Sequence, residues 1–223
     1  MNMNFDFNNG RLVPKRDFNL VGVGFDVAPY MAQLNAHPEL WEQSRDFRKV
    51  PRYNGELSPH RESQDIWVRH QPYDSFGNYD VNEEEQAKMM VPTVSEWYPE
   101  ALKLPAAMDM AEAVCRHVSA IQLGGHYIIK VPAGKKVYPH SDFSWHSTYY
   151  NKYLVVLKTQ PGVVFGWERS GNMIPVTGDL WNFENDTQHW VYNDSDEDVL
   201  IATFSVRTFN MDRWEAVNKA KGA

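Results

Sequence analysis

The sequence has little cysteine and no long uninterrupted hydrophobic run, and each shortage excludes a class of protein. A single cysteine, Cys115, excludes a disulfide framework within the chain. The absence of disulfides favours a reducing compartment, so we expect a cytoplasmic protein. No apolar run approaches the roughly 18 residues that a transmembrane helix needs, so we expect no membrane partner. The first residues contain no apolar core of a signal peptide, and we expect no secretion signal.

Basic charge is also scarce. The chain has 22 Lys and Arg residues against 29 Asp and Glu residues, which gives a formal net charge of −7. Because no basic block stands out, we expect no nucleic-acid partner. Hydrophobic residues make up 43% of the 223 residues, and aromatic residues make up 13%. This composition predicts a folded globular protein, and the length suits one domain spanning residues 1–223.

The first half of the chain carries turn and helix signals. We expect strands at 18–25 and 65–71, and short helices at 27–35, 37–43 and 82–90. Asp26 precedes the first of these helices and is the residue type preferred at an N-cap.

A longer amphipathic helix is predicted over residues 104–120. Hydrophobic residues there recur at steps of four and three, at Leu104, Met108, Ala111, Cys115 and Val118. Because Cys115 lies on this face, we interpret it as a small core residue and not as a nucleophile.

The second half changes to short strand-like runs separated by turns. The predicted strands lie at 126–131, 150–159, 163–168, 173–176, 180–185, 189–193 and 199–209. Short strands at this spacing predict a mainly β protein with flanking helices, in which the strands form a sandwich or barrel. The helix at 104–120 would then pack on the outside of one sheet.

The stretch "PHSD" contains a candidate metal site. Residues two apart on a strand project to the same side, so His140 and Asp142 would point together. His189 begins a later predicted strand and could supply a third ligand. Two histidines and one carboxylate form the facial triad of non-haem Fe(II) enzymes, which leaves coordination positions open. The alternative is that these are ordinary polar residues at strand ends.

Two segments resemble a known family. The stretch "KVPAGKKVYPHSD" is similar to the first-ligand segment of Fe(II)/2-oxoglutarate-dependent oxygenases, and "GDLWNFENDTQHWVYNDSDEDVLIATFSV" is similar to the segment with the distal histidine. The resemblance is narrower still to the aspartyl/asparaginyl β-hydroxylase branch. It implies a double-stranded β-helix core (jelly roll, cupin-like) at 121–210, with residues 1–120 as a helix-rich N-terminal portion packed on the barrel. It also implies that His140, Asp142 and His189 bind the iron.

The co-substrate contact is less regular. The distal carboxylate of 2-oxoglutarate needs a cation, because a buried carboxylate without a partner is costly. The resemblance implies an arginine ten residues after the distal histidine, where this chain has Val199. We expect Lys152 to replace it, with Arg207 second and Lys158 third.

Two further histidines lie near the candidate ligands in the sequence. We interpret His146 as a residue at the rim of the site or behind the ligands, although it could also be a ligand. His126 is expected to have a structural role or to form part of a pocket wall.

The resemblance implies a hydroxylase with Fe(II), 2-oxoglutarate and O₂ as cofactor and co-substrates, and with succinate and CO₂ as co-products. Its substrate would carry an unactivated C–H bond, for instance in a peptidyl or free amino-acid side chain (Asp, Asn or Pro). Two alternatives stay open: a cupin-like metal-dependent enzyme that does not use 2-oxoglutarate, and a noncatalytic ligand-binding barrel. Turnover of 2-oxoglutarate would distinguish the hydroxylase from both of these alternatives.

Overall fold

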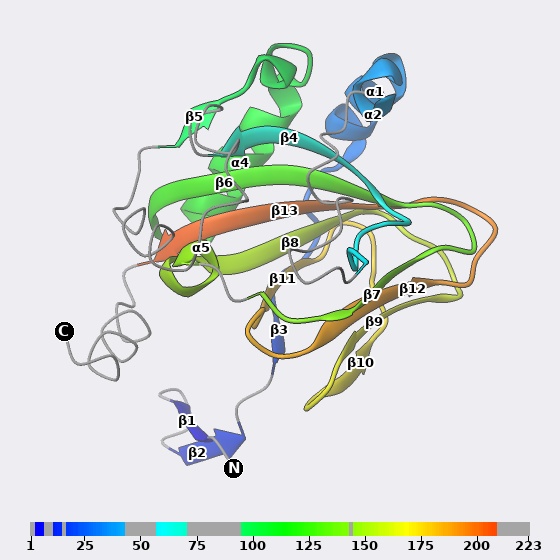
Figure 1. Ribbon diagram of the computed structural model, residues 1–223. Helices are drawn as coiled ribbons and strands as arrows, with labels where there is room; N and C mark the ends of the chain where they lie inside the picture. Colours follow the sequence, from blue (N-terminus) through cyan, green and yellow to red (C-terminus); the bar gives the residue numbers. More distant parts are fainter. Residues whose placement is uncertain are drawn as a thin grey trace.

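The computed structural model describes residues 3–6, 11–14, 17–42, 57–70, 95–142 and 145–208. The helix predicted at 82–90 lies outside these residues. Within them, the chain forms a seven-stranded sheet, a four-stranded sheet and a separate hairpin of β1 (Met3–Asp6) and β2 (Arg11–Pro14) (Figure 1). None of the described helices is long and apolar enough to cross a membrane.

The larger sheet is antiparallel throughout and contains strands from both halves of the chain. Its order is β3 (Phe18–Gly22), β11 (Leu180–Phe183), β8 (Asn151–Lys158), β13 (Val199–Thr208), β6 (Ala120–Val131), β4 (Gln64–His70) and β5 (Glu96–Trp97). The N-terminal half therefore contributes sheet strands as well as helices.

The smaller sheet faces the larger one. Its order is β10 (Gly171–Met173), β9 (Val163–Trp167), β12 (His189–Asn193) and β7 (Lys136–His140). From β6 to β13 the chain passes back and forth between the two sheets, which is the connectivity of a jelly roll. This confirms the predicted fold class, a mainly β protein with flanking helices and a double-stranded β-helix core.

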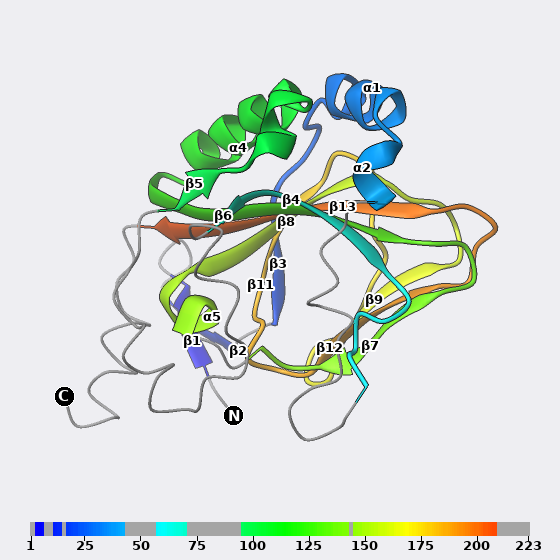
Figure 2. The same cartoon turned by 45° about the horizontal axis from the view of Figure 1, so that its top comes forward.

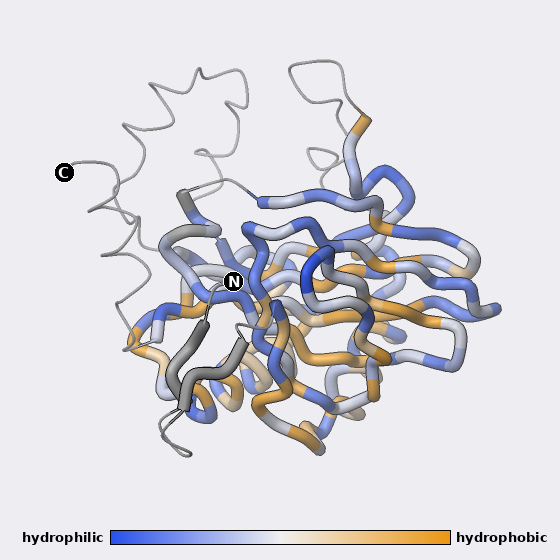
Figure 3. The backbone as a smooth tube through the Cα atoms, turned by 90° about the horizontal axis from the view of Figure 1, so that it is seen from below, coloured by the Kyte–Doolittle hydropathy of each residue, from blue (hydrophilic) through white to orange (hydrophobic). Residues whose placement is uncertain are grey.

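The central strands β8 and β13 of the larger sheet are buried on both faces, which explains the hydrophobic run in the middle of each. In β8 and β13, Leu154, Val156 and Ile201 point into the space between the sheets. Their neighbours Val155 and Ala202 point to the opposite face, where they join a second core under the helices. Figure 3 shows this hydrophobic colouring along the strands, with hydrophilic residues in many of the connecting turns.

Helices cover the outer face of the larger sheet (Figure 2). They are α1 (Ala28–Ala36), α2 (Glu39–Glu42), the 3₁₀ helix η3 (Pro99–Leu102) and α4 (Pro105–His117), whereas the short α5 (Trp145–Tyr149) lies next to β8. The prediction that the helix after residue 104 packs on the outside of one sheet is confirmed. Asp26 accepts a hydrogen bond from the backbone N–H of Ala28 at 3.0 Å, but the N-cap position itself is Val27.

The predicted buried face of α4 is wrong in part. Ala107, Met110 and Val114 are buried, whereas Met108 is 38% exposed. The buried stripe therefore lies about one residue before the predicted one, with Ala111 common to both. Cys115 is half-buried at the edge of this core, and its burial raises the pKa of the thiol.

Several strand bounds also differ from the prediction. β6 begins six residues earlier than expected, at Ala120. β10 ends at Met173, so the exposed Ile174 and Val176 follow the strand and are not part of it. The hydrophobicity of Ile174 and Val176 therefore does not mark a strand, because these two side chains are exposed, whereas Met173 ends β10 and is buried in the core.

Candidate metal centre

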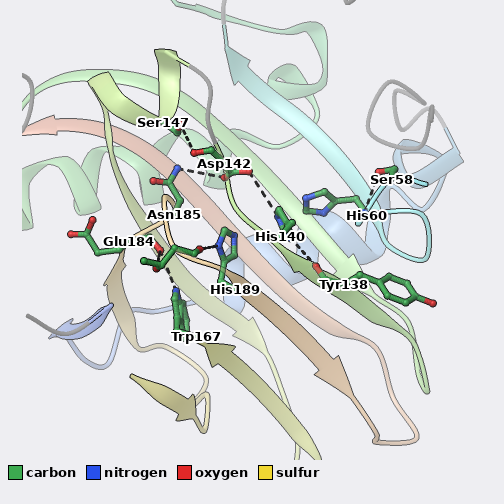
Figure 4. Close-up of polar contacts among 11 residues, drawn as sticks. Ser58, His60, Tyr138, His140, Asp142, Ser147, Trp167, Glu184, Asn185 and His189 are labelled. Atoms are coloured by element: carbon green, nitrogen blue, oxygen red, sulfur yellow. Dashed lines mark hydrogen bonds and ion pairs between the residues drawn. The ribbon is translucent and has the colours of Figure 1, made fainter. Parts of the chain in front are cut away.

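The structure brings the three predicted ligands together. His140, Asp142 and His189 each offer one ligand atom, and these atoms lie within 4.8 Å of one another. The histidines face each other because β7 and β12 pair antiparallel with His140 opposite His189, and their ring centroids are 4.4 Å apart (Figure 4). Strand pairing therefore brings together His140 and His189, which are far apart in the sequence.

Backbone carbonyl groups orient both imidazole rings. The Nδ1–H of His140 donates to the carbonyl oxygen of Tyr138 at 2.7 Å, and the Nδ1–H of His189 donates to that of Thr187 at 2.9 Å. A neutral imidazole that donates from Nδ1 carries its lone pair on Nε2. Each histidine is thus held in the tautomer that offers Nε2 to a metal ion.

Asp142 is positioned differently from the prediction. The strand β7 ends at His140, so strand alternation does not direct the Asp142 side chain. Instead, the backbone N–H of Asp142 donates to the carbonyl of Asn185 at 2.7 Å, and Ser147 Oγ–H donates to the Asp142 carbonyl at 3.0 Å. The predicted residue is in place, but the reason lies in contacts between loops.

A cavity of about 60 Å³ adjoins the three ligands. Its other lining side chains are mostly apolar or aromatic, and they come from both sheets: Tyr127, Ile129, Val137, Leu154, Phe165, Trp167, Phe183, Val191 and Ile201. Such a lining excludes water and strengthens electrostatic interactions inside the cavity.

Lys152 lies on the same inner face of the barrel. It is opposite Ser205 in the β8–β13 register, next to the cavity-lining pair Leu154 and Thr203. Its side chain is buried, and Nζ donates to Ser205 Oγ at 2.6 Å and lies 5.6 Å from the ring centre of Tyr127. Among the described residues, no carboxylate pairs with this ammonium group.

The other predicted cations lie in different surroundings. Arg207 is buried against α5, where Nη1 donates to the Tyr149 carbonyl at 3.3 Å and the guanidinium lies over the Tyr149 ring. Lys158 is partly exposed and forms an ion pair with Glu197 at 2.7 Å. Val199, at the position where an arginine was expected, is fully buried in the core between the sheets.

The two remaining histidines of the prediction are outside the ligand group. His146 is buried in α5 and stacks on His70 with ring centroids 4.4 Å apart. Burial, and then the charges of Lys152 and His70, lower the pKa of His146 well below its ordinary value. His126 is buried under α1, so it is not part of the cavity wall.

Sequence reasoning missed His60, which lines the cavity from a turn before β4. The ring of His60 lies edge-on to that of His140, with centroids 4.7 Å apart (Figure 4). The turn is fixed to β7 because the backbone N–H of Tyr138 donates to the Pro59 carbonyl at 2.9 Å. No pattern in the sequence links this turn to β7.

Asn185 and Ser205 were also missed. A signal existed for Asn185, which lies four residues before His189 in a polar turn, but that turn reads as ordinary loop composition. Ser205 is part of an apolar strand, and only its pairing with Lys152 reveals it.

Comparison with known proteins finds no matching family model and no matching curated sequence. Among solved structures, a 2OG-Fe(II) oxygenase family oxidoreductase from Burkholderia pseudomallei aligns over 86% of this chain and 85% of that chain, with a TM-score of 0.50 and 9% identity. A prolyl-4-hydroxylase from Pseudomonas putida aligns over 86% and 91%, with a TM-score of 0.45 and 16% identity. At these identities the likeness concerns the fold alone.

Proposed function

We propose that this protein is a non-haem Fe(II)/2-oxoglutarate-dependent dioxygenase that hydroxylates an unactivated C–H bond. The observation that carries the proposal is the convergence of His140, Asp142 and His189, with both histidines held in the tautomer that a metal requires. Two histidines and one carboxylate with open positions are the donor set of Fe(II) oxygenases. Bound iron would supply the oxidation, which consumes O₂ and 2-oxoglutarate and yields succinate and CO₂.

Lys152 is the proposed partner of the distal carboxylate of 2-oxoglutarate. A buried ammonium group is costly unless an anion compensates it, and the described residues contain no carboxylate that does so. Ser205 holds Nζ in place and offers a hydroxyl group to the same carboxylate. Arg207 remains second, because its guanidinium is directed at Tyr149.

The apolar lining of the cavity has two roles in this proposal. It keeps water away from the reacting carbon, and it accepts the hydrocarbon part of a substrate. A peptidyl or free amino-acid side chain such as Asp, Asn or Pro fits this description, and the narrower resemblance to the aspartyl/asparaginyl β-hydroxylase branch points to the same class. The metal site and the Lys152 contact do not depend on which of these is the substrate.

A second candidate is a cupin-like metal-dependent enzyme that does not use 2-oxoglutarate. The specific observation in its favour is Val199, which is buried in the core. The aspartyl/asparaginyl β-hydroxylase branch, which this chain resembles, carries an arginine at this position. Lys152 counts against this candidate, because its buried charge is explained by an anionic co-substrate.

Anaerobic titration of Fe(II) and 2-oxoglutarate tests the proposal. We expect the weak visible charge-transfer band of chelated 2-oxoglutarate in the wild-type protein and its loss in His140→Ala. The matched control is His37→Ala, because His37 pairs with Glu39 on α2, away from the cavity, and should leave the band unchanged. Iron binding without the band would favour the second candidate, and no iron binding would favour a noncatalytic barrel.

A further inference from the structure

Asn185 contacts the carboxylate ligand through both its backbone and its side chain. Its carbonyl accepts the backbone N–H of Asp142 at 2.7 Å, and its Nδ2 lies 3.5 Å from Asp142 Oδ2 (Figure 4). The residue is completely buried, in a turn between β11 and β12. The same turn holds His189 through the Thr187 carbonyl, so one segment organises two of the three ligands.

The two oxygens of Asp142 have different neighbours. Oδ1 lies 3.9 Å from His140 Nε2, whereas Oδ2 lies 3.5 Å from the amide Nδ2 of Asn185. A carboxylate arranged in this way presents one oxygen to the metal and the other to a hydrogen-bond donor. This arrangement favours coordination through Oδ1 over coordination through both oxygens.

The amide of Asn185 does not have a balanced set of hydrogen bonds. Within the described part of the chain, its Oδ1 is buried and has no hydrogen-bond partner. Burying the amide oxygen without a hydrogen-bond donor costs free energy. The side-chain amide is not needed to hold the turn, because the backbone carbonyl of Asn185 already binds the N–H of Asp142. The contact of Nδ2 with Asp142 is thus the interaction that accounts for a carboxamide at this position.

We propose that Asn185 is a positioning residue that keeps Asp142 coordinated through Oδ1 alone. If Asp142 bound the metal through both oxygens, it would occupy one more coordination position. The co-substrate needs two positions and O₂ a third, so the site would be one position short. The proposal rests on the proposed metal site and explains how its open positions are preserved.

Mn(II) is a suitable probe because it accepts oxygen and imidazole ligands and reports its bound water through proton relaxation. In the wild-type protein, a six-coordinate ion with three protein ligands keeps about three waters. In Asn185→Leu, which keeps the branched shape of the side chain and its number of heavy atoms but has no donor, we expect the water contribution to relaxation to fall by about one third. We also expect weaker 2-oxoglutarate binding to the metal-loaded protein, by about tenfold or more.

Asn151→Leu is the matched control. It removes an amide whose Nδ2 donates to Thr208 Oγ1 at 2.9 Å, and this hydrogen bond does not involve the metal ligands. It should leave the relaxation unchanged. Asn185→Ala repeats the test if the leucine variant does not fold. Unchanged relaxation in folded Asn185 variants would overturn the proposal, even if Mn(II) affinity falls. If wild type binds Mn(II) but 2-oxoglutarate displaces no water, the dioxygenase function fails separately; if wild type binds no Mn(II), both proposals fail.

Discussion

Tyr138 and Thr187 contribute to the candidate metal centre through their backbone carbonyl groups. Each carbonyl accepts the Nδ1–H of the histidine two residues later, which fixes the tautomer without using a side chain. The carboxylate ligand depends in the same way on the backbone of Asn185. Substitutions at Tyr138 and Thr187 should therefore lower the metal affinity less than substitutions of the proposed ligands themselves.

The buried ammonium group of Lys152 leads to a prediction for single residues. Lys152→Met should weaken 2-oxoglutarate binding to the Fe(II) protein by about 10²-fold, because a charge-assisted hydrogen bond contributes about 1.5–3 kcal/mol. The free energy of unfolding without ligands should not fall, since methionine fills the space of the lysine stem and no ion pair is lost. Anaerobic titration and urea unfolding measure the two quantities.

Lys158→Met provides the control for this prediction. Lys158 has the same chemistry on the same strand, but it pairs with Glu197 near the solvent. Its replacement should leave 2-oxoglutarate affinity within about twofold, because surface ion pairs contribute at most about 1 kcal/mol and this one is far from the cavity. Equal losses in both variants would contradict the role given to Lys152.

At the scale of elements, α1 is joined to the sheet by a buried polar contact. His126 Nδ1–H donates to the Thr203 carbonyl at 3.0 Å, and its Nε2 accepts the hydroxyl of Tyr30 at 2.8 Å. Both ring nitrogens are satisfied in the neutral form. Burial lowers the pKa of His126 to about 4.

This contact predicts that acid weakens the fold. An exposed histidine in the unfolded chain has a pKa of about 6.5, so below that pH the unfolded state binds a proton that the folded state resists. Above pH 6.5, protonation of His126 should not change the free energy of unfolding. As the pH drops from there toward about 4, the free energy of unfolding should fall by at most about 3 kcal/mol in total. Because the pKa of His146 is lowered too, the difference between wild type and His126→Gln in urea unfolding at several pH values isolates the effect.

The pairing of β9 with β12 depends on the glycine opposite Trp190. A Cβ atom at Gly166 would lie 2.0 Å from Trp190 Cε2, and Trp190 is next to His189. Gly166→Ala should destabilise the protein by about 1–3 kcal/mol through overpacking, and should also weaken metal binding because β12 carries a ligand. Unfolding and metal titration test both parts.

Gly171→Ala separates these two effects. Gly171 has a positive φ of 77°, and a Cβ there would contact nothing within 4 Å. The alanine variant should lose about 1–2 kcal/mol through backbone strain, yet keep its metal affinity. Weakened metal binding in both variants would mean that general destabilisation, and not the position of β12, is responsible.

At the scale of the whole molecule, the candidate site lies between the two sheets and the helices lie behind the larger one (Figure 2). A ligand that binds there contacts strands of both sheets, so its binding is coupled to the stability of the entire barrel. Fe(II) with 2-oxoglutarate at 100 times its dissociation constant should stabilise the fold by about 2.7 kcal/mol.

For a chain of this size, that stabilisation corresponds to a rise of about 5–10 °C in Tm. Anaerobic thermal unfolding with and without the ligands measures it. Asp142→Ala should abolish the shift while changing the Tm of the ligand-free protein little, since the Asp142 side chain is 38% exposed. A shift that persists in this variant would place the ligands elsewhere.

The sequence predicted most of the strands, though not all of their bounds, and the identity of the proposed ligands. The runs at 153–157 and 199–202 are apolar because both faces of the larger sheet are buried there, and such runs are visible without a structure. The sequence predicted His140, Asp142 and His189 because few residue types bind metals and because the segments that carry these residues resemble a known family. The predicted roles of Lys152 and Arg207 remain predictions. The surroundings of the two side chains differ from each other, because Lys152 contacts Ser205 next to the cavity and Arg207 contacts Tyr149 of α5.

Tertiary structure alone decided which residues surround those ligands. His60, Asn185 and Ser205 meet the site through strand register and contacts between turns, which join segments far apart in the chain. Such contacts leave no periodic pattern in a single sequence. The buried face of α4 was misjudged for a related reason: apolar residues cover more than one stripe of this helix, so the sequence alone does not show which stripe faces the sheet. Packing against β6 selects the stripe that contains Ala107, Met110 and Val114 and leaves Met108 exposed.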